Sequence, residues 1–403
     1  MTQRCRLSTL AALVLLGLTA CSPGSISPGR TPGDAGVPRT DAGRDGGVSQ
    51  QQDAGTDNHV NLFAYVGTTG GNTRIHRFRL DESSGDLSEL KTVDGGADPS
   101  FLAFSSDRRF LFAVNEADGT VRSYAIAAGT GELTFLSSAT TGEGAARNGT
   151  THLSLDQSGK WLLVANYGGG STGVFPVGTD GKLGAQAHRV PSGANAHQIV
   201  TDPSNAFVFV PTLGLDRVQQ YALDASTGAL SPQIPPALET GRGSGPRHLA
   251  FHPSERRLYL ATEYSNELLS LSHDSQGRLT LLDRLSTLAD AAEASTGAEV
   301  AVHPAGHTVY VSNRRKEGGE IAWFREGAAG KLTRAGAVPT AGLTPRHFSL
   351  TPSGALLLVA NQDTGNIAVM RVDALTGALT PLGEKATGLP GASFVGVISL
   401  PAP

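Results

Sequence analysis

Four short stretches of the chain place a histidine ahead of an apolar segment and a polar turn. They are GTTHLSLDQSG (149–159), ANAHQIVTDPS (194–204), GSGPRHLAFHP (243–253) and LTPRHFSLTPSG (343–354). In the last two, Pro-Arg precedes the histidine. An imidazole can accept or donate a proton near neutral pH, and a guanidinium group binds planar anions. Together these groups could activate a water molecule and stabilise a negative charge that develops on an oxygen atom.

The elements that must position these residues recur about every 50 residues. The strand-like segments FAYVGT, LFAVNE, LLVANY, VFVPTL, LYLATE, VYVSNR and LLVANQ begin at positions 63, 111, 162, 208, 258, 309 and 357. Each unit contains four short strand patterns separated by turns rich in Gly, Asp and Ser, without an amphipathic helical run. The pattern predicts an all-β fold, a seven-bladed β-propeller of four-stranded blades.

The two ends of the repeat region predict how the ring closes. The first unit starts directly at FAYVGT and lacks its leading strand, whereas SFVGVISL (393–400) is an apolar strand without a unit of its own. A solenoid would leave that strand as an unpaired edge. We therefore predict that it forms the innermost strand of the first blade and closes the ring.

Strand direction gathers the polar residues at one end of the central channel. Within an antiparallel blade, the turn entering the innermost strand and the turn leaving the second strand lie on the same face. The residues predicted at this mouth are Glu116, Asn166, Tyr167, His197, Arg247, His248, Glu263, Glu299, Arg314, Arg346, His347 and Gln362.

Residues that recur at one repeat position are expected to be mainly structural. His152, His248 and His347 share such a position, and we expect them to hold the turn before the innermost strand by hydrogen bonds. Glu263 and Arg314 break the repeat, because they stand near equivalent positions in adjacent blades with opposite charges. Arg247 lies 16 residues before Glu263, at the other end of the same hairpin, so the two should meet at the mouth. Either a structural ion pair or an active site would explain such a contact.

Several phrases, in their order and spacing, resemble the bacterial seven-bladed lactonase family. They are ADPSFLAFSSDRRFLFAVNE, LLVANYGGGSTGVFPV, GSGPRHLAFHP, and TPRHFSLTPSG followed by LLVANQDTGNIAVMRVD. That family includes the propeller-type 6-phosphogluconolactonases and is similar to the fungal carboxy-muconate lactonizing enzymes. The resemblance covers essentially residues 59–403. It implies that His197, Arg247, Glu263 and Arg314 form the catalytic cleft.

The resemblance predicts lactone hydrolysis, with Glu263 or His197 as the base that activates water. Arg247 and Arg314 would bind the oxyanion, a substrate carboxylate or a phosphate. The residues expected to contact a lactone or organic-acid ligand are His248, Arg346, His347, Gln362, Glu116, Tyr167 and Glu299.

Two other functions remain open at this point. One is a non-catalytic propeller that binds a ligand or an envelope partner at the same mouth. The other is a muconate-type cycloisomerase, in which proton transfer replaces water attack. An open, hydrated pocket facing Glu263 and Arg247 would favour an enzyme, whereas a mouth plugged by Tyr167 or by residues 315–320 would favour a binding module.

The N-terminus predicts export and lipid anchoring. MTQRCRLSTLAALVLLGLTAC has a basic start, an apolar stretch too short to span a membrane, and small residues before Cys21. It resembles a bacterial lipoprotein signal, which implies cleavage after residue 20, acylation of Cys21, and, with Ser22 next, a location at the outer membrane. Residues 21–58 are poor in large apolar side chains and are predicted to be a disordered tether. The globular domain would span 59–403.

Charge and residue spacing exclude other partners. The formal net charge is −4, and removal of Arg4 and Arg6 with the signal makes it −6. No basic run alternates with aromatic residues, which argues against nucleic acid. The histidines are distributed along the blades and no CxxC spacing occurs, so we expect neither a metal nor a cofactor. Cys21 would be the only cysteine of the mature chain, which excludes an internal disulfide.

Overall fold

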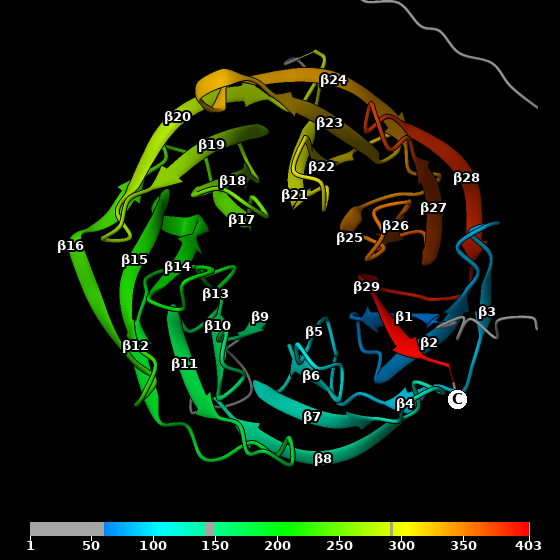
Figure 1. The fold of residues 1–403 in the computed structure, drawn as a ribbon, viewed down its shortest axis with the longest axis horizontal. Helices are drawn as coiled ribbons and strands as arrows, with labels where there is room; N and C mark the ends of the chain where they lie inside the picture. The colour runs from blue at the N-terminus through cyan, green and yellow to red at the C-terminus, as the bar shows by residue number, and fades with distance from the viewer. Residues whose placement is uncertain (1–59, 142–148, 291–292, 403) are drawn as a thin grey trace, which may run out of the picture. The chain divides into compact units, whose positions relative to one another are not determined.

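The computed structural model describes residues 60–141, 149–290 and 293–402, which form seven antiparallel sheets arranged in a ring (Figure 1). The predicted all-β fold, a seven-bladed β-propeller, is confirmed. The predicted signal peptide, the tether and Cys21 lie outside the described residues. Within the described ranges, no helix is long and apolar enough to cross a membrane.

The first blade combines the two ends of the propeller. It contains β29 (Ala392–Pro401), β1 (Val60–Thr68), β2 (Arg74–Leu80) and β3 (Leu87–Glu89), with β4 (Val93–Asp94) paired to β2. β29 runs antiparallel to β1 from the pair Val60 and Pro401 to the pair Thr68 and Ala392. The red C-terminal strand accordingly lies beside blue β1 in Figure 1. The predicted closure of the ring by the C-terminal segment is confirmed.

The other six blades each use four strands that follow one another in the chain. The second blade has β5 (Phe101–Phe104), β6 (Phe110–Asn115), β7 (Thr120–Ile126) and β8 (Leu133–Thr140). The third has β9 (Thr150–Leu155), β10 (Trp161–Asn166), β11 (Ser171–Pro176) and β12 (His188–Pro191). The fourth has β13 (Val200–Thr201), β14 (Phe207–Thr212), β15 (Arg217–Asp224) and β16 (Ala229–Glu239).

Blades five to seven complete the ring. The fifth has β17 (Pro246–Phe251), β18 (Arg257–Thr262), β19 (Glu267–His273) and β20 (Leu279–Ser286). The sixth has β21 (Ser295–Val302), β22 (Thr308–Arg315), β23 (Glu320–Glu326) and β24 (Leu332–Pro339). The seventh has β25 (Pro345–Leu350), β26 (Leu356–Asn361), β27 (Asn366–Val372) and β28 (Leu379–Ala386). Two short 3₁₀ turns, η1 (Leu213–Leu215) and η2 (Ala328–Gly330), lie within connections.

The hydrophobic core lies between neighbouring blades. Tyr259 of β18, Val311 of β22 and Phe324 of β23, for example, belong to one buried cluster shared by the fifth and sixth blades. Because both faces of each sheet pack against another blade, the second strands are apolar along most of their length instead of alternating. This packing holds the innermost strands, and the side chains at their ends, in fixed positions around the axis.

Candidate active site at the channel mouth

Six innermost strands, and in the fourth blade the segment just before β13, each place one side chain at the central axis. We call these residues the floor ring: Phe101, His152, His197, His248, Glu299, His347 and Phe394. The ring centroid of Phe101, in the second blade, lies 4.2 Å from that of His152 and 5.3 Å from that of His347. It also lies 4.7 Å from that of Phe394 and 6.0 Å from that of His248. Contacts from one blade to four others show that these side chains meet across the axis and close it.

A β-bulge aims a second side chain of several blades at the mouth. In the fifth blade, Pro246 pairs with Thr262 and His248 with Ala261, which leaves Arg247 as the extra residue. The same irregularity precedes His152, His347 and Phe394 and leaves Thr151, Arg346 and Ser393 unpaired. Successive residues of a regular strand point to opposite faces, whereas a bulge lets neighbours turn the same way.

These bulged residues form the wall of a small hollow above the floor ring. The lining residues are Ser100, Phe101, Thr151, His197, Arg247, His248, Arg346, His347 and Ser393. The space between them holds about one water molecule. A larger ligand would therefore rest on the hollow and contact the rim. Neither Tyr167 nor residues 315–320 belong to the lining.

The predicted contact between Arg247 and Glu263 is present and includes Arg314. Arg247 Nε donates to Glu263 Oε2 over 3.1 Å, and Arg314 Nη2 lies 2.9 Å from the same oxygen. Arg247 Nη1 also donates to the Ala298 carbonyl oxygen, 2.9 Å away, and Arg314 Nη2 donates to that of Gly297, also at 2.9 Å. The Arg247 side chain is 2 % exposed and that of Glu263 is 18 % exposed. A nearly buried guanidinium is thus compensated by one carboxylate and one carbonyl group.

Both arginines remain cationic at neutral pH. Burial, followed by the nearby charge of Arg314, lowers the pKa of Arg247 to about 9. Burial likewise lowers the pKa of Arg314 from its usual value, while the charge of Glu263 opposes this change.

Arg346 adds a third guanidinium group without a partner of its own. It is half-buried in the wall, and no hydrogen bond or ion pair joins it to another described residue. In blades five to seven, the mouth therefore has three guanidinium groups, those of Arg247, Arg314 and Arg346, and one rim carboxylate, that of Glu263. The excess of positive charge suits an anion or a developing oxyanion.

Four floor residues form a continuous polar arc. His197 Nδ1 lies 3.1 Å from His248 Nε2, and His248 Nδ1 lies 2.8 Å from Glu299 Oε2. His347 Nε2 lies 3.4 Å from the same carboxylate oxygen. Burial is the main cause that lowers the pKa of His197 and of His248 well below the usual histidine value, and it raises the pKa of Glu299.

The recurring histidines do not hold the turns as the sequence suggested. The backbone N–H groups of Ile199 and Val395 donate to Nδ1 of His152 and His347, each over 3.4 Å. Each histidine thus bridges to the backbone of the next blade, at or just before that blade's innermost strand. His248 makes the equivalent bridge to Glu299.

The remaining predicted residues occupy different places. Tyr167 packs edge-on against His197, with ring centroids 5.6 Å apart. Glu116 and Gln362 follow β6 and β26 at the rim, and each has one buried side-chain oxygen without a partner among the described residues. The polar atoms of His248 and Glu299 are already engaged below the hollow, so these two residues support the site from beneath.

Several residues that line the hollow were not among the site residues predicted from the sequence. Phe101, Ser100, Thr151 and Ser393 all line the hollow. A signal was present, because SFLAF and SFVGV align with HLSL and HLAF, so that phenylalanine stands where other blades have histidine. Phenylalanine is also a residue type typical of an apolar core, so its type alone does not indicate a place at the axis.

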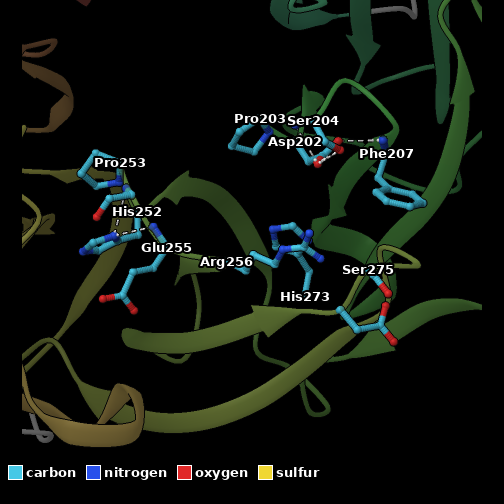
Figure 2. Close-up of a pocket in the computed structure, with 12 residues that line it drawn as sticks. Asp202, Pro203, Ser204, Phe207, His252, Pro253, Glu255, Arg256, His273 and Ser275 are labelled. Atoms are coloured by element: carbon cyan, nitrogen blue, oxygen red, sulfur yellow. Dashed lines mark hydrogen bonds between the residues drawn. The ribbon is translucent and has the colours of Figure 1, made fainter.

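A larger pocket lies between the fourth and fifth blades, at the turns that join their first and second strands (Figure 2). It contains about 660 Å³ of empty space, part of it open to solvent. Two of its polar side chains serve their own turns: Asp202 accepts from the Phe207 N–H, and His252 Nδ1 accepts from the Glu255 N–H. A similar groove of about 720 Å³ lies between the second and third blades. Both grooves lie between neighbouring blades, and neither brings several guanidinium groups together as the mouth does.

Within residues 60–141, 149–290 and 293–402, no group of three or more His, Cys, Asp or Glu side chains could hold a metal ion.

The fold and the mouth together define a β-propeller with a cationic site at one end of its channel. The chain belongs to the family described as "Lactonase, 7-bladed beta-propeller", whose model matches residues 63–396. It is 32 % identical to a 6-phosphogluconolactonase of Bacillus subtilis over 337 residues, covering 79 % of this chain and 94 % of the relative. It is also 32 % identical to the 6-phosphogluconolactonase of Pectobacterium carotovorum, covering 81 % of this chain and 96 % of the relative.

A solved structure shares the same architecture. The periplasmic gluconolactonase of Pseudomonas aeruginosa superposes with a TM-score of 0.77 at 28 % identity, covering 85 % of this chain and 99 % of the other.

Proposed function

We propose that this protein hydrolyses a sugar lactone at the channel mouth. The observation that carries the proposal is the Arg247–Glu263–Arg314 cluster in a propeller of the lactonase family. Arg247 lines the hollow together with His197, whereas Glu263 and Arg314 lie behind Arg247 and are not part of the lining. The names of the two relatives and of the similar solved structure support a gluconolactone-type substrate.

His197 suits the role of the base better than Glu263 does. Burial keeps the pKa of His197 low, so the imidazole is neutral at pH 7, and its Nε2 has no hydrogen-bond partner among the described residues. In contrast, Glu263 Oε2 already receives both arginines. We assign Glu263 to holding the two guanidinium groups in place.

The reaction then proceeds in two steps at the hollow. His197 Nε2 takes a proton from water while the water oxygen attacks the lactone carbonyl carbon, and Arg247 stabilises the oxyanion. The bond between this carbon and the ring oxygen then breaks, and the protonated His197 returns the proton to the leaving oxygen. The product is the open-chain hydroxy acid.

The charge of the mouth favours a substrate that carries an anionic group. Arg346 has no carboxylate partner among the described residues, so it is available for a carboxylate or phosphate remote from the carbonyl.

A lactone panel tests the function. The purified full chain is assayed with glucono-δ-lactone, 6-phosphoglucono-δ-lactone and simple γ- and δ-lactones, with spontaneous hydrolysis subtracted. Glu263→Ala, His197→Ala and Arg247→Ala are measured in parallel. We expect hydrolysis by the wild type and a loss in all three variants. Equal rates in all four proteins would contradict the proposal, and tight lactone binding without turnover would indicate a binding module.

We also propose that Cys21 is acylated and anchors the protein in the bacterial cell envelope, with the propeller outside the cytoplasm. The lipoprotein-like N-terminus supports this location, as does the periplasmic origin named for the similar structure. A Cys21→Ala variant should lose incorporation of labelled palmitate and move from the membrane to the soluble fraction. An unchanged membrane fraction would contradict anchoring through this cysteine.

A further inference from the structure

The polar arc of the floor ring has one end whose proton position is fixed by the backbone. The Val395 N–H group, which can only donate, points at His347 Nδ1 over 3.4 Å. Nδ1 is therefore the unprotonated nitrogen, and the neutral ring carries its proton on Nε2. That nitrogen lies 3.4 Å from Glu299 Oε2.

Glu299 is consequently surrounded by donors. The Val300 N–H group donates to Oε1 over 3.1 Å, and the protonated edge of His347 faces Oε2. Glu299 is 6 % exposed, and among the described contacts of its carboxyl group only His248 Nδ1 could be either a donor or an acceptor. Burial raises the pKa of Glu299, whereas the charges of His347 and Arg247 and the Val300 N–H group oppose this change. Hydrogen bonds donated to a carboxylate favour its ionised form, so the geometry of the donors assigns the ionised state to Glu299.

An ionised Glu299 sets the direction of the next two hydrogen bonds. His248 Nδ1, 2.8 Å from Oε2, must be the donor, since the carboxylate has no proton to give. Neutral His248 then has an unprotonated Nε2, which accepts from His197 Nδ1 over 3.1 Å. His197 thereby keeps its proton on Nδ1 and exposes the lone pair of Nε2.

We propose that Glu299 is a positioning residue which, through His248, holds His197 in the tautomer whose free Nε2 faces the hollow. The catalytic consequence rests on the proposed lactone hydrolysis, whereas the tautomer itself does not. When His197 takes a proton from water, its ring becomes positively charged. His248 then links this imidazolium by hydrogen bonds to the buried carboxylate of Glu299.

The groups around His197 act in the same direction. Its nearest charged or titratable neighbours are Tyr167, His248, Arg247, Arg346 and Arg314. The three guanidinium groups oppose a second proton on the ring. His197 is thus kept neutral in the resting state, and the tautomer decides which nitrogen can act.

The experiment compares Glu299→Gln with a matched control, Glu320→Gln. Both change a buried glutamate of the sixth blade to an amide of the same size, but Glu320 bonds Asn313 and Arg315 outside the arc. The full chain is labelled with ¹⁵N-histidine, and two-bond ¹H–¹⁵N spectra at pH 7 report the proton position on each ring. His197→Asn identifies the His197 signals, and thermal melting checks that each variant is folded.

We expect the Nδ1–H tautomer of His197 in the wild type and in Glu320→Gln. In Glu299→Gln the side-chain NH₂ can donate to His248 Nδ1, which reverses both hydrogen bonds and moves the His197 proton to Nε2. For lactone hydrolysis, kcat should fall by about 10²-fold or more with little change in KM.

The Nε2–H tautomer in the wild type would overturn the proposal. An unchanged His197 tautomer with an unchanged kcat in Glu299→Gln would also overturn it. If no lactone is hydrolysed by the wild type, the spectra still decide the tautomer, so failure of the function and failure of the positioning role are distinguishable.

Discussion

The two sides of the floor ring differ in chemistry although their residues occupy corresponding positions of the repeat. His197, His248, Glu299 and His347 form a polar arc in blades four to seven. Phe101 and Phe394 occupy the corresponding positions of the second and first blades and pack on each other, on His152 and on His347. The repeat thus positions one side chain of each blade at the axis. The residue type decides whether that side chain can take part in proton transfer or only packs against its neighbours.

The wall above the floor shows the same contrast. The bulge that presents Arg247 and Arg346 in blades five and seven presents Ser393 and Thr151 in blades one and three. Charge therefore gathers on one side of the mouth, above the polar arc. A substrate would be oriented by this asymmetry, with its carbonyl group toward the arginines.

The largest effect should come from removing the base of the polar arc. His197→Asn should lower kcat for lactone hydrolysis by about 10³-fold, because no neutral imidazole remains to accept the water proton. His152→Asn, at the equivalent position outside the arc, is the control, since the amide oxygen can still accept from the Ile199 N–H. Steady-state kinetics check both variants, and equal losses would show that the two positions do not differ in function.

Removing the charged wall residue should have the next largest effect. Arg247→Met keeps much of the side-chain volume but removes the guanidinium, so kcat/KM should fall by about 10² to 10³-fold. Arg256→Met changes an exposed arginine of the same blade and should leave kinetics unchanged. Should both variants behave alike, Arg247 would have only a structural role.

Acid should weaken the fold through the polar arc. Burial is the main cause that lowers the pKa of folded His347 to about 4, whereas an unfolded histidine titrates near 6.5. Between these values the unfolded chain binds more protons, so the stabilisation is complete above about pH 6.5 and is lost toward pH 4. For one such group the loss is about 3 kcal/mol. The pKa values of His152, His197 and His248 are lowered in the same sense, while the raised pKa of Glu299 opposes them.

Urea unfolding at about pH 7, 5.5 and 4.5 would measure this loss. His347→Phe makes the seventh blade resemble the first, and its stability should depend less on pH than that of the wild type. The same pH dependence in both proteins would exclude His347 as a source of acid sensitivity.

The aromatic half should show the smallest effect. Phe101→Leu keeps an apolar side chain at the axis, so we expect a loss of about 1 kcal/mol of unfolding free energy with little change in kcat. Urea unfolding and the lactone assay check the two values. A kinetic loss as large as that of His197→Asn would remove the distinction between the two halves.

The sequence was sufficient for the fold because the evidence for it is local. The repeat spacing, the strand patterns and the missing first strand predicted seven blades and closure by residues 393–400, and the pairing of β29 with β1 confirmed it. The Arg247–Glu263 contact was also accessible, since both residues end one hairpin and its length sets their positions.

Only the tertiary structure decided which side chains of different blades contact one another around the axis. The alternation rule of a regular strand gives no indication that Arg247 and His248 both face the channel, because a bulge depends on pairing with the neighbouring strand. The bond from His248 to Glu299 joins residues 51 positions apart, and that from Val395 to His347 joins residues 48 apart in different blades. Such contacts arise when complete blades pack around an axis, so the residue types could suggest acid–base chemistry, but only the closed ring orders them into a chain of hydrogen bonds.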